Sequence, residues 1–353
     1  MLTSIEINGF RGFERLQIPN LAPVTVFTGM NGAGKTTVLE AILALHGRFS
    51  PTWVLNLQAH HGFSKLSSSS GPNYLGLFYG FRDAGSATIK GVFGAGAQCE
   101  LVLERSTSGQ QGQIPPTGPS STGVGAPVTD LICKAYRGSK LVNETALVWT
   151  HNPPQPPQLT VRGGRDPERR AVLVHPSGQA AGEEEIARFG DAMAAGRTGR
   201  IVDAMRLLNE SIEGIEYIPK TTGEYFAAKI NGIPRPLGLL GAGINHIFRF
   251  LVGLDHVRGG CLAIDEVENG IHHSALEKVF KAIIHCALED ETQLVISTHS
   301  AEALAAIGRA AGDHGKNVLG VVHMARGKKD VIEAHVFRGA DAVSSIQLGY
   351  EMR

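Results

Sequence analysis

The sequence has few cysteines, no net charge and no long apolar run. Its four cysteines, Cys99, Cys133, Cys261 and Cys286, form no Cys-x-x-Cys pair. Their scatter argues against a zinc knuckle and a disulfide framework and indicates a reducing compartment. No apolar stretch is long enough to span a bilayer, and strand-like sequence begins at Leu2 without a charged-then-apolar leader. We therefore expect a cytoplasmic protein with no membrane association.

Positive and negative charges balance in this chain of 353 residues, which has 33 lysines and arginines and 33 aspartates and glutamates. A neutral protein has no global positive field that attracts nucleic acid, so DNA contact would need a local patch or a groove in a dimer. A basic cluster does occur at Arg162, Arg165, Arg169 and Arg170. We interpret it as a solvated face, with a contact to phosphates or to a partner as the alternative.

A glycine-rich motif stands near the N-terminus. Gly29–Thr36 matches the phosphate-binding pattern Gly-x-x-x-x-Gly-Lys-Thr. The apolar run Val24–Phe27 before it is typical of a buried strand, and Thr36–Leu45 after it has helical spacing, with Val38, Ile42 and Leu45 on one face. Glycines let several N–H groups point at one phosphate, and the helix N-terminus adds its positive dipole end.

This context predicts a role for each residue of the motif. Lys35 would reach the β- and γ-phosphates of a nucleotide, and the Thr36 hydroxyl would bind Mg²⁺. A chance glycine-rich turn is disfavoured because strand, lysine, threonine and helix are all present. The expected nucleotide-binding residues of this segment are Asn31, Gly32, Ala33, Gly34, Lys35, Thr36 and Thr37.

A buried strand that ends in two acidic residues lies far downstream, at Gly260–Glu266. Asp265 would complete the Mg²⁺ site begun by Thr36. Glu266 would face the attacking water and act as general base. An acidic helix cap is the alternative for either carboxylate taken alone, but the phosphate-binding motif upstream favours the functional interpretation.

A second strand delivers a histidine at its tip, in the sequence Gln293–Ser300. At this position His299 would donate a hydrogen bond to the γ-phosphate and position the water. A lone histidine after a strand is more often structural, so the prediction depends on the two other motifs. The paired histidines His60-His61 and His272-His273 lack further ligands nearby and are not expected to bind metal.

Hydrophobic spacing predicts strands and helices along the rest of the chain. After two N-terminal strands and the phosphate loop, we expect strands at Ala87–Phe93, Gln98–Leu103, Ala146–Thr150, Ala171–Val174, Ile212–Ile218 and Glu224–Ile230, a surface loop at Gly109–Pro127, and helices over Glu183–Asn209 with a break near Gly196 and Gly199. The last third alternates: helix Gly243–Leu254, strand Cys261–Ile264, helix His273–Leu288, strand Gln293–Ser297, helix Ala301–Ile307, and strands Val318–His323 and Val331–Phe337. This alternation predicts a largely parallel sheet with helices on its faces.

The three motifs in this order resemble an ABC-type ATPase head. The opening Ile5–Phe13 is similar to the first strand of the chromosome-maintenance (SMC) and recombination-mediator (RecF-like) class, and Glu268–His272 resembles that class's dimer-contacting loop. The nearest resemblance is to the overcoming-lysogenisation-defect (OLD) family and its relatives in bacterial anti-phage systems. It is clear over residues 1–46 and 200–353.

The resemblance implies an α/β P-loop NTPase fold, an ABC-type head with a mostly parallel core sheet, an antiparallel β subdomain and a helical subdomain. It also implies that Arg11 approaches the bound nucleotide. We expect a single head in four regions: an N-terminal lobe with the phosphate loop (1–105), a variable insert (106–182), a helical region with the signature motif (183–255) and a C-terminal lobe (256–353).

ABC heads hydrolyse ATP as head-to-tail dimers, in which each nucleotide lies between one subunit's phosphate loop and the other's signature motif. The candidate signature is Leu240–Asn245, where Gly241, Ala242 and Gly243 would contact the nucleotide. Gly241 replaces the usual serine and removes a hydroxyl contact, so only backbone N–H groups would remain. A plain glycine-rich helix start is the alternative. For the glutamine loop, Gln58 and Gln98 are weak candidates, and neither is assigned.

OLD-family nucleases carry a metal-dependent domain of the topoisomerase-primase (Toprim) type, which needs an Asp-x-Asp pair. No such pair occurs after Glu266. We therefore expect the ATPase head alone, as an ATP- and Mg²⁺-dependent homodimer or larger homo-oligomer that senses a signal and holds a separate effector, such as a nuclease, in anti-phage defence. The alternative is a RecF-like DNA-repair ATPase that clamps duplex DNA. A transporter subunit is disfavoured by the N-terminal segment and the unusual signature.

Overall fold

The structure is a computed structural model. It describes residues 1–47, 74–81, 85–107, 129–150, 158–163, 170–174, 183–219, 225–315, 317–327 and 331–347. The predictions at Gln58, at His60-His61 and for the Gly109–Pro127 loop lie outside these residues. Of the predicted basic cluster, the side chain of Arg170 is described, and it is exposed.

The described chain divides into two compact units. The first consists of Met1–Thr3, Ile18–His46 and Arg169–Arg353, and the second of Ser4–Gln17 and Gly47–Glu168. The first 105 residues thus contribute to both units, as do the first two strands. Among the described residues no helix is long and apolar enough to cross a bilayer.

A six-stranded sheet forms the centre of the first unit, in the order β16-β15-β3-β14-β13-β9. Its strands are β3 (Val24–Gly29), β9 (Ala171–Val174), β13 (Cys261–Ile264), β14 (Gln293–Ser297), β15 (Leu319–Arg326) and β16 (Ile332–Arg338). All neighbours are parallel except β16, which runs antiparallel to β15. Every residue of β3, β13 and β14 is buried, as expected for parallel strands covered on both faces. The predicted mostly parallel core sheet is confirmed.

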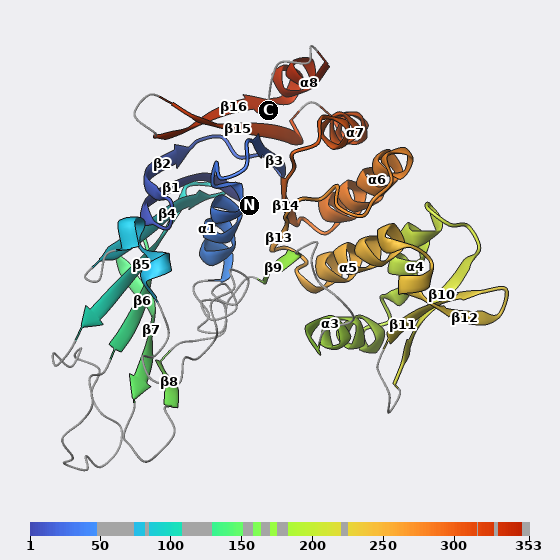
Figure 1. The fold of residues 1–353 in the computed structure, drawn as a ribbon, viewed down its shortest axis with the longest axis horizontal. Coiled ribbons are helices and arrows are strands. Elements are labelled where there is room, and N and C mark those ends of the chain that lie inside the picture. Colours follow the sequence, from blue (N-terminus) through green and yellow to red (C-terminus); the bar gives the residue numbers. More distant parts are fainter. Residues whose placement is uncertain are drawn as a thin grey trace. The chain divides into compact units, whose positions relative to one another are not determined.

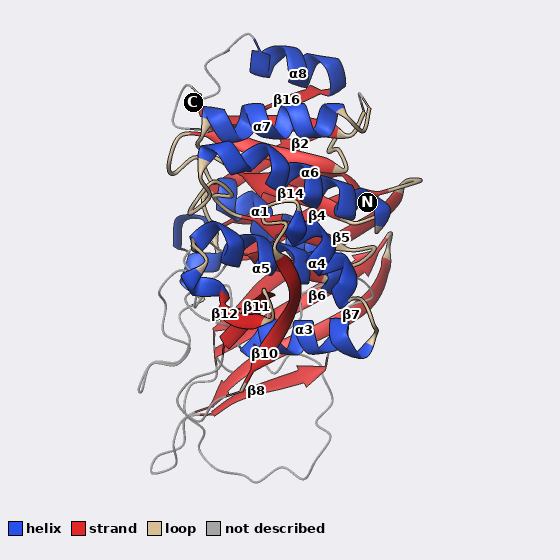
Figure 2. Ribbon diagram, turned by 90° about the vertical axis from the view of Figure 1, so that its right-hand side faces the viewer, coloured by secondary structure: helices blue, strands red, loops and turns tan. Residues whose placement is uncertain are grey.

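Three helices cover one face of this sheet: α5 (Ala242–His256), α6 (His273–Glu289) and α7 (Ala301–Gly312). Figure 1 shows them on one side of β13 and β14, with α1 (Lys35–Gly47) on the other side, and Figure 2 shows α5, α6 and α7 in successive rows. Three strands of this sheet, β3, β13 and β14, end at the predicted functional motifs. The helices that pack on the sheet therefore hold these strand ends in place.

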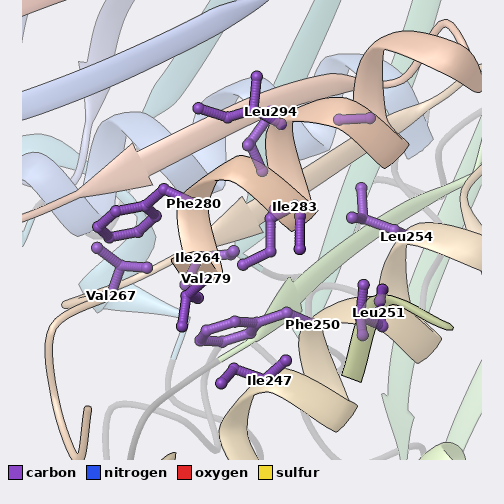
Figure 3. Close-up of a cluster of buried hydrophobic side chains, with 14 of the residues drawn as sticks. Ile247, Phe250, Leu251, Leu254, Ile264, Val267, Val279, Phe280, Ile283 and Leu294 are labelled. Atoms are coloured by element: carbon purple, nitrogen blue, oxygen red, sulfur yellow. The ribbon is translucent and has the colours of Figure 1, made fainter. Parts of the chain in front are cut away.

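The core between α5, α6 and the sheet follows from helical spacing. Apolar residues recur every three or four positions on α5 and fall on one face that packs against α6 (Figure 3). Each buried side chain of this kind contributes roughly 1.5–3 kcal/mol to folding. The labelled members of this cluster are Ile247, Phe250, Leu251, Leu254, Ile264, Val267, Val279, Phe280, Ile283 and Leu294.

Helix α1 differs from its prediction. Its sequence spacing predicts one buried face, but every residue from Val38 to His46 is buried. Leu39, Ala41, Leu43 and Ala44 make the remaining sides largely apolar, and Glu40 and His46 are buried among them. The helix after the phosphate loop is therefore a central element of the first unit.

The other elements of this unit are α3 (Glu183–Ala194), α4 (Thr198–Arg206), β10 (Ile212–Ile218), β11 (Tyr225–Ile230), β12 (Ile233–Pro236), η3 (Leu237–Leu239) and α8 (Gly339–Gln347). The predicted helix break occurs at Gly196, where φ is +69°. Strand β12 and helix α8 were not predicted. Two prolines obscured β12, although Asn231-Gly232, with both φ values positive, is a strong hairpin signal.

The second unit contains a seven-stranded sheet in the order β2-β1-β4-β5-β6-β7-β8. Its strands are β1 (Leu2–Phe10), β2 (Phe13–Ile18), β4 (Ser86–Phe93), β5 (Ala97–Thr107), β6 (Thr129–Arg137), β7 (Lys140–Thr150) and β8 (Gln158–Gly163), with short 3₁₀ turns η1 (Leu75–Leu77) and η2 (Tyr79–Phe81). The pairs from β4 to β8 are antiparallel, which confirms the antiparallel β subdomain. Strands β6 and β8 and the start of β7 were not predicted, although buried Leu131, Cys133 and Ala135 alternate along β6.

Candidate functional site

The phosphate-loop motif forms the turn between β3 and α1. Gly29, Gly32 and Gly34 have φ values of +132°, +77° and +84°, which suit glycine. A Cβ atom on Gly29 would overlap the backbone carbonyl oxygen of Met324 on β15, so no other residue fits there. Of the remaining predicted residues, Asn31 is exposed, Thr36 and Thr37 are half-buried, and Ala33 is buried.

Lys35 points back over this loop. Its Nζ donates hydrogen bonds to the carbonyl oxygens of Gly29, at 2.9 Å, and Met30, at 3.0 Å, and lies 3.3 Å from Nδ1 of His299. Burial lowers the pKa of the Lys35 ammonium, and three nearby carboxylates oppose that shift: Asp265, Glu266 and Glu268. The side chain is thus a buried cation at the point where the motif predicts phosphate.

Asp265 meets the Thr36 hydroxyl at the end of β13. Thr36 Oγ1 donates a hydrogen bond of 2.8 Å to Asp265 Oδ2, and Ser297 Oγ donates to Oδ1 of the same carboxylate. The parallel register, in which Ile264 lies opposite Ile296, sets Asp265 beside Ser297. Both oxygens of this buried carboxylate are therefore held by hydroxyl groups.

These donors fit a magnesium ion. A threonine hydroxyl and an aspartate carboxylate lie 2.8 Å apart at the start of α1, and Mg²⁺ prefers such oxygen ligands. In protein sites it also keeps water and phosphate oxygens as ligands, so two side chains suffice. The described residues contain no group of three histidine, cysteine, aspartate or glutamate side chains that could hold a metal by themselves. Thr36 and Asp265 would hold Mg²⁺ when it is bound with a nucleotide.

Glu266 and His299 lie beside each other at the same sheet edge. The Glu266 N–H donates to Ser297 Oγ at 2.8 Å, and Asn269 Nδ2 donates to Glu266 Oε2 at 2.7 Å. Glu266 Oε1 is 3.9 Å from His299 Nε2, whose ring also approaches Lys35. Glu266 has a φ of +46°, a conformation that non-glycine residues adopt mainly where surrounding contacts impose it. The structure therefore brings the three predicted catalytic side chains together.

The candidate signature segment opens α5. Gly241 is the N-cap residue, with a φ of +106° and no side-chain cap, and Ala242 and Gly243 begin the first turn. A Cβ on Gly243 would lie 3.3 Å from the carbonyl oxygen of Gly270, so the segment packs closely on the loop that follows β13. The N–H groups of this helix start are suited to an anion.

Arg11 belongs to the second unit. Its φ is +51°, its N–H donates to the Leu77 carbonyl oxygen at 3.0 Å, and its guanidinium lies 5.8 Å from the centre of the Phe10 ring. Its contact with nucleotide stays a prediction.

Comparisons with known proteins match the same regions. A family model described as "AAA domain" matches residues 4–80, and one described as "AAA domain, putative AbiEii toxin, Type IV TA system" matches residues 149–305. A Helicobacter pylori protein named "ATP/GTP phosphatase" is 22% identical over 324 residues, which cover 86% of each chain. An SMC head bound to the C-winged helix domain of ScpA aligns over 97% of this chain and 99% of its own, with 11% identity and a TM-score of 0.55. The SMC head domain from Thermotoga maritima aligns over 96% and 99%, with 14% identity and a TM-score of 0.45.

The chain is an ATPase with an SMC-like head fold. The predicted P-loop, ABC-type fold class is thereby confirmed. The fold similarity spans both units, each of which aligns with parts of the SMC head.

Sequence patterns alone did not identify four residues that shape the site of this ATPase: Glu268, Asn269, Ser297 and Thr298. Ser297 bonds both Asp265 and the Glu266 backbone, and Asn269 bonds the Glu266 carboxylate. Glu268 accepts hydrogen bonds from Thr298 and His299. The sequence did contain a signal for Ser297. Since β14 pairs with β13 in parallel, the last residue of β14, Ser297, lies beside the acidic pair that follows β13.

Proposed function

We propose that this ATPase binds ATP with Mg²⁺, closes as a homodimer around the nucleotide, and uses its nucleotide state to hold or release a separate effector protein in bacterial anti-phage defence. The observation that carries the proposal is the convergence of Lys35, Thr36, Asp265, Glu266 and His299 at one edge of a parallel sheet. This is the edge at which ligands bind in open α/β folds.

Hydrolysis follows from the groups at this edge. The backbone N–H groups of the loop and the Lys35 ammonium bind the β- and γ-phosphates. Thr36 and Asp265 would hold Mg²⁺, which when bound would supply positive charge to the phosphate oxygens. Glu266 takes a proton from the attacking water. The water oxygen bonds the γ-phosphorus while the bond from that phosphorus to the bridging oxygen of the leaving ADP breaks. His299 donates a hydrogen bond to the γ-phosphate and stabilises the charge of the transition state.

We propose a dimer because the signature segment offers backbone N–H donors but contains no phosphate-binding loop itself. In the closed form, the N–H groups of Gly241, Ala242 and Gly243 would face the nucleotide on the second subunit, with Arg11 near the nucleotide of its own subunit. The signature carries no side-chain hydroxyl. Its contribution would therefore come from backbone groups and the helix dipole.

Two comparisons support a separate effector. The SMC head structure contains a bound domain of another protein, ScpA, so a head of this fold can hold a partner. The second family model carries a toxin–antitoxin description, which agrees with control of a harmful activity. We propose a nuclease as the effector, because the OLD family, which the motifs resemble, combines a head of this kind with nuclease activity.

The test is to purify tagged Lys35→Ala and Glu266→Gln proteins from the native host and identify what accompanies each. The first variant should remain in the nucleotide-free state, and the second should remain closed around ATP. Recovery of the same toxic enzyme with only one of them supports the proposal. Recovery of duplex DNA alone with the closed form would overturn it in favour of a DNA clamp, and metal-dependent nuclease activity of the pure chain would contradict a separate effector.

A further inference from the structure

In the loop after β13, the Glu268 carboxylate accepts hydrogen bonds from the turn that carries His299. We infer that Glu268 is a positioning residue for the ATPase reaction, holding His299 where it can reach the γ-phosphate. The inference rests on the proposed function, because it assigns Glu268 a role through His299. Glu268 follows the acidic pair, in the segment that resembles a dimer-contacting loop, and the sequence motifs assign it no part in hydrolysis.

Each oxygen of the Glu268 carboxylate has its own donor in this turn. Glu268 Oε2 accepts a hydrogen bond of 2.8 Å from Thr298 Oγ1, and Oε1 accepts one of 2.8 Å from the His299 backbone N–H. The carboxylate thus uses one oxygen for each of two consecutive residues. Two bonds from one rigid planar group fix both the position and the rotation of the turn that follows β14.

The other side of the turn is held by helix α7. The Ser300 N–H donates to Thr298 Oγ1 at 3.1 Å, and Ser300 Oγ caps α7 by accepting from the Ala303 N–H at 3.1 Å. The Thr298 hydroxyl therefore accepts from one side and donates to Glu268 on the other. Removing that hydroxyl would break the link between the Glu268 loop and the start of α7.

The turn determines where the imidazole of His299 lies. Its Nδ1 is 3.3 Å from Lys35 Nζ and its Nε2 is 3.9 Å from Glu266 Oε1, so the ring lies between the proposed phosphate cation and the proposed base. A displacement of about 1 Å in such a group can cost on the order of 100-fold in rate. Glu268 would act through that distance without touching the reacting atoms.

A second role must be separated from this one. Glu268 is one of three carboxylates that favour the charged form of Lys35, so its loss could weaken ATP binding through electrostatics alone. Thr298 distinguishes the two roles. Thr298→Val removes the hydroxyl bond and keeps the Glu268 charge, while Thr298→Ser keeps both.

The experiment measures kcat, KM and the Kd for ATP in Glu268→Gln, His299→Ala and the double variant. Glutamine has one acceptor where two are used, so we expect kcat to fall about 10- to 100-fold with less than about a threefold change in Kd. The double variant should be no slower than His299→Ala by more than about threefold, because both changes remove one function. Thr298→Val should lower kcat as Glu268→Gln does, and Thr298→Ser should retain the parental value.

Three results would overturn the inference: rate losses that multiply in the double variant, an ATP Kd that weakens as much as kcat falls, or a parental kcat for Thr298→Val. Glu302→Gln, at an exposed position in the first turn of α7, is the matched control and should leave kcat unchanged. Thermal unfolding of each variant identifies loss of fold, and the threonine pair keeps the test valid if Glu268→Gln unfolds. Failure of the proposed function itself is distinct, since Lys35→Ala and Glu266→Gln would then hydrolyse ATP at the parental rate.

Discussion

Two helices of the first unit begin with glycine-rich segments, and they differ in what surrounds those glycines. At the start of α1, Gly29 is packed so closely that a side chain would strike β15, and Lys35, Thr36 and Asp265 add a cation, a hydroxyl and a carboxylate. At the start of α5, Gly241 faces open space, and Leu239 just before it is 81% exposed. The first segment lies in a chemically complete site. The second offers backbone donors alone, and its proposed role at a nucleotide held by another subunit would rest on them.

The largest expected effect tests the complete site. Glu266→Gln removes the proposed base and keeps the shape of the side chain, so kcat should fall by about 10²- to 10⁴-fold while ATP still binds. A steady-state phosphate-release assay together with size-exclusion chromatography in ATP should show slow turnover and an accumulated dimer. Turnover at the parental rate would mean that Glu266 is not the base.

Lys35→Ala should affect binding more than any change at the α5 segment. Because the ammonium is the buried cation of the loop, we expect the Kd for ATP to rise at least about 100-fold, measured by titration calorimetry. Gly241→Ala leaves every donor of its own subunit's phosphate loop in place and should change the Kd of the monomer by less than about threefold. Equal losses in the two variants would contradict the contrast between the segments.

The two glycines should also differ in stability. Gly29→Ala combines a positive φ with overlap on the Met324 carbonyl, so we expect a loss of more than about 3 kcal/mol in the free energy of unfolding. Gly241→Ala meets only the unfavourable φ of +106°, at a cost of about 1–2 kcal/mol. Denaturant unfolding of the nucleotide-free protein measures both. A smaller loss at Gly29 than at Gly241 would refute the packing argument.

The smallest effect concerns pH. Burial lowers the pKa of Lys35 below its ordinary value of 10.5, so the unfolded chain binds more protons at Lys35 than the folded chain does as the pH rises towards 10.5. Stability contributed by this residue should therefore rise with pH in that alkaline window. Lys35→Met should lack this slope, which denaturant unfolding of the two proteins at the ends of the window measures. A difference with the opposite sign would show that the ammonium is stabilised by its hydrogen bonds more than it is destabilised by burial.

Strong local signals allowed much of the first unit to be predicted. The phosphate loop, the apolar strands β3, β13 and β14, and the alternation of helix and strand after Gly241 all appear where the sequence indicates them. These segments combine short, continuous apolar runs with glycines at their ends, so local preference and burial agree. The contrast is β12, whose prolines oppose the pattern of a strand, and β6, where the apolar residues Ile132 and Tyr136 on the other face obscure the alternation.

Contacts between the motifs could not be predicted in the same way. Glu268 bonds Thr298 and His299, which are 30 and 31 residues away in the sequence. Asn269 reaches Glu266 only because the loop turns back after Glu266, whose φ is positive. Hydrogen bonds of this type carry no periodic signal in the sequence. They depend on which strands become neighbours and in which register.

The sequence by itself determined the chemistry of this ATPase: the glycines that admit a phosphate, the lysine, threonine, aspartate, glutamate and histidine that can act on it, and the strands that end beside them. Those properties are local, since residue type and spacing over a few positions decide them. The tertiary structure decided which groups meet. Parallel pairing of β3, β14 and β13 brings the ends of three distant segments to one edge, and it makes Ser297 and Glu268 the residues that hold the site in place.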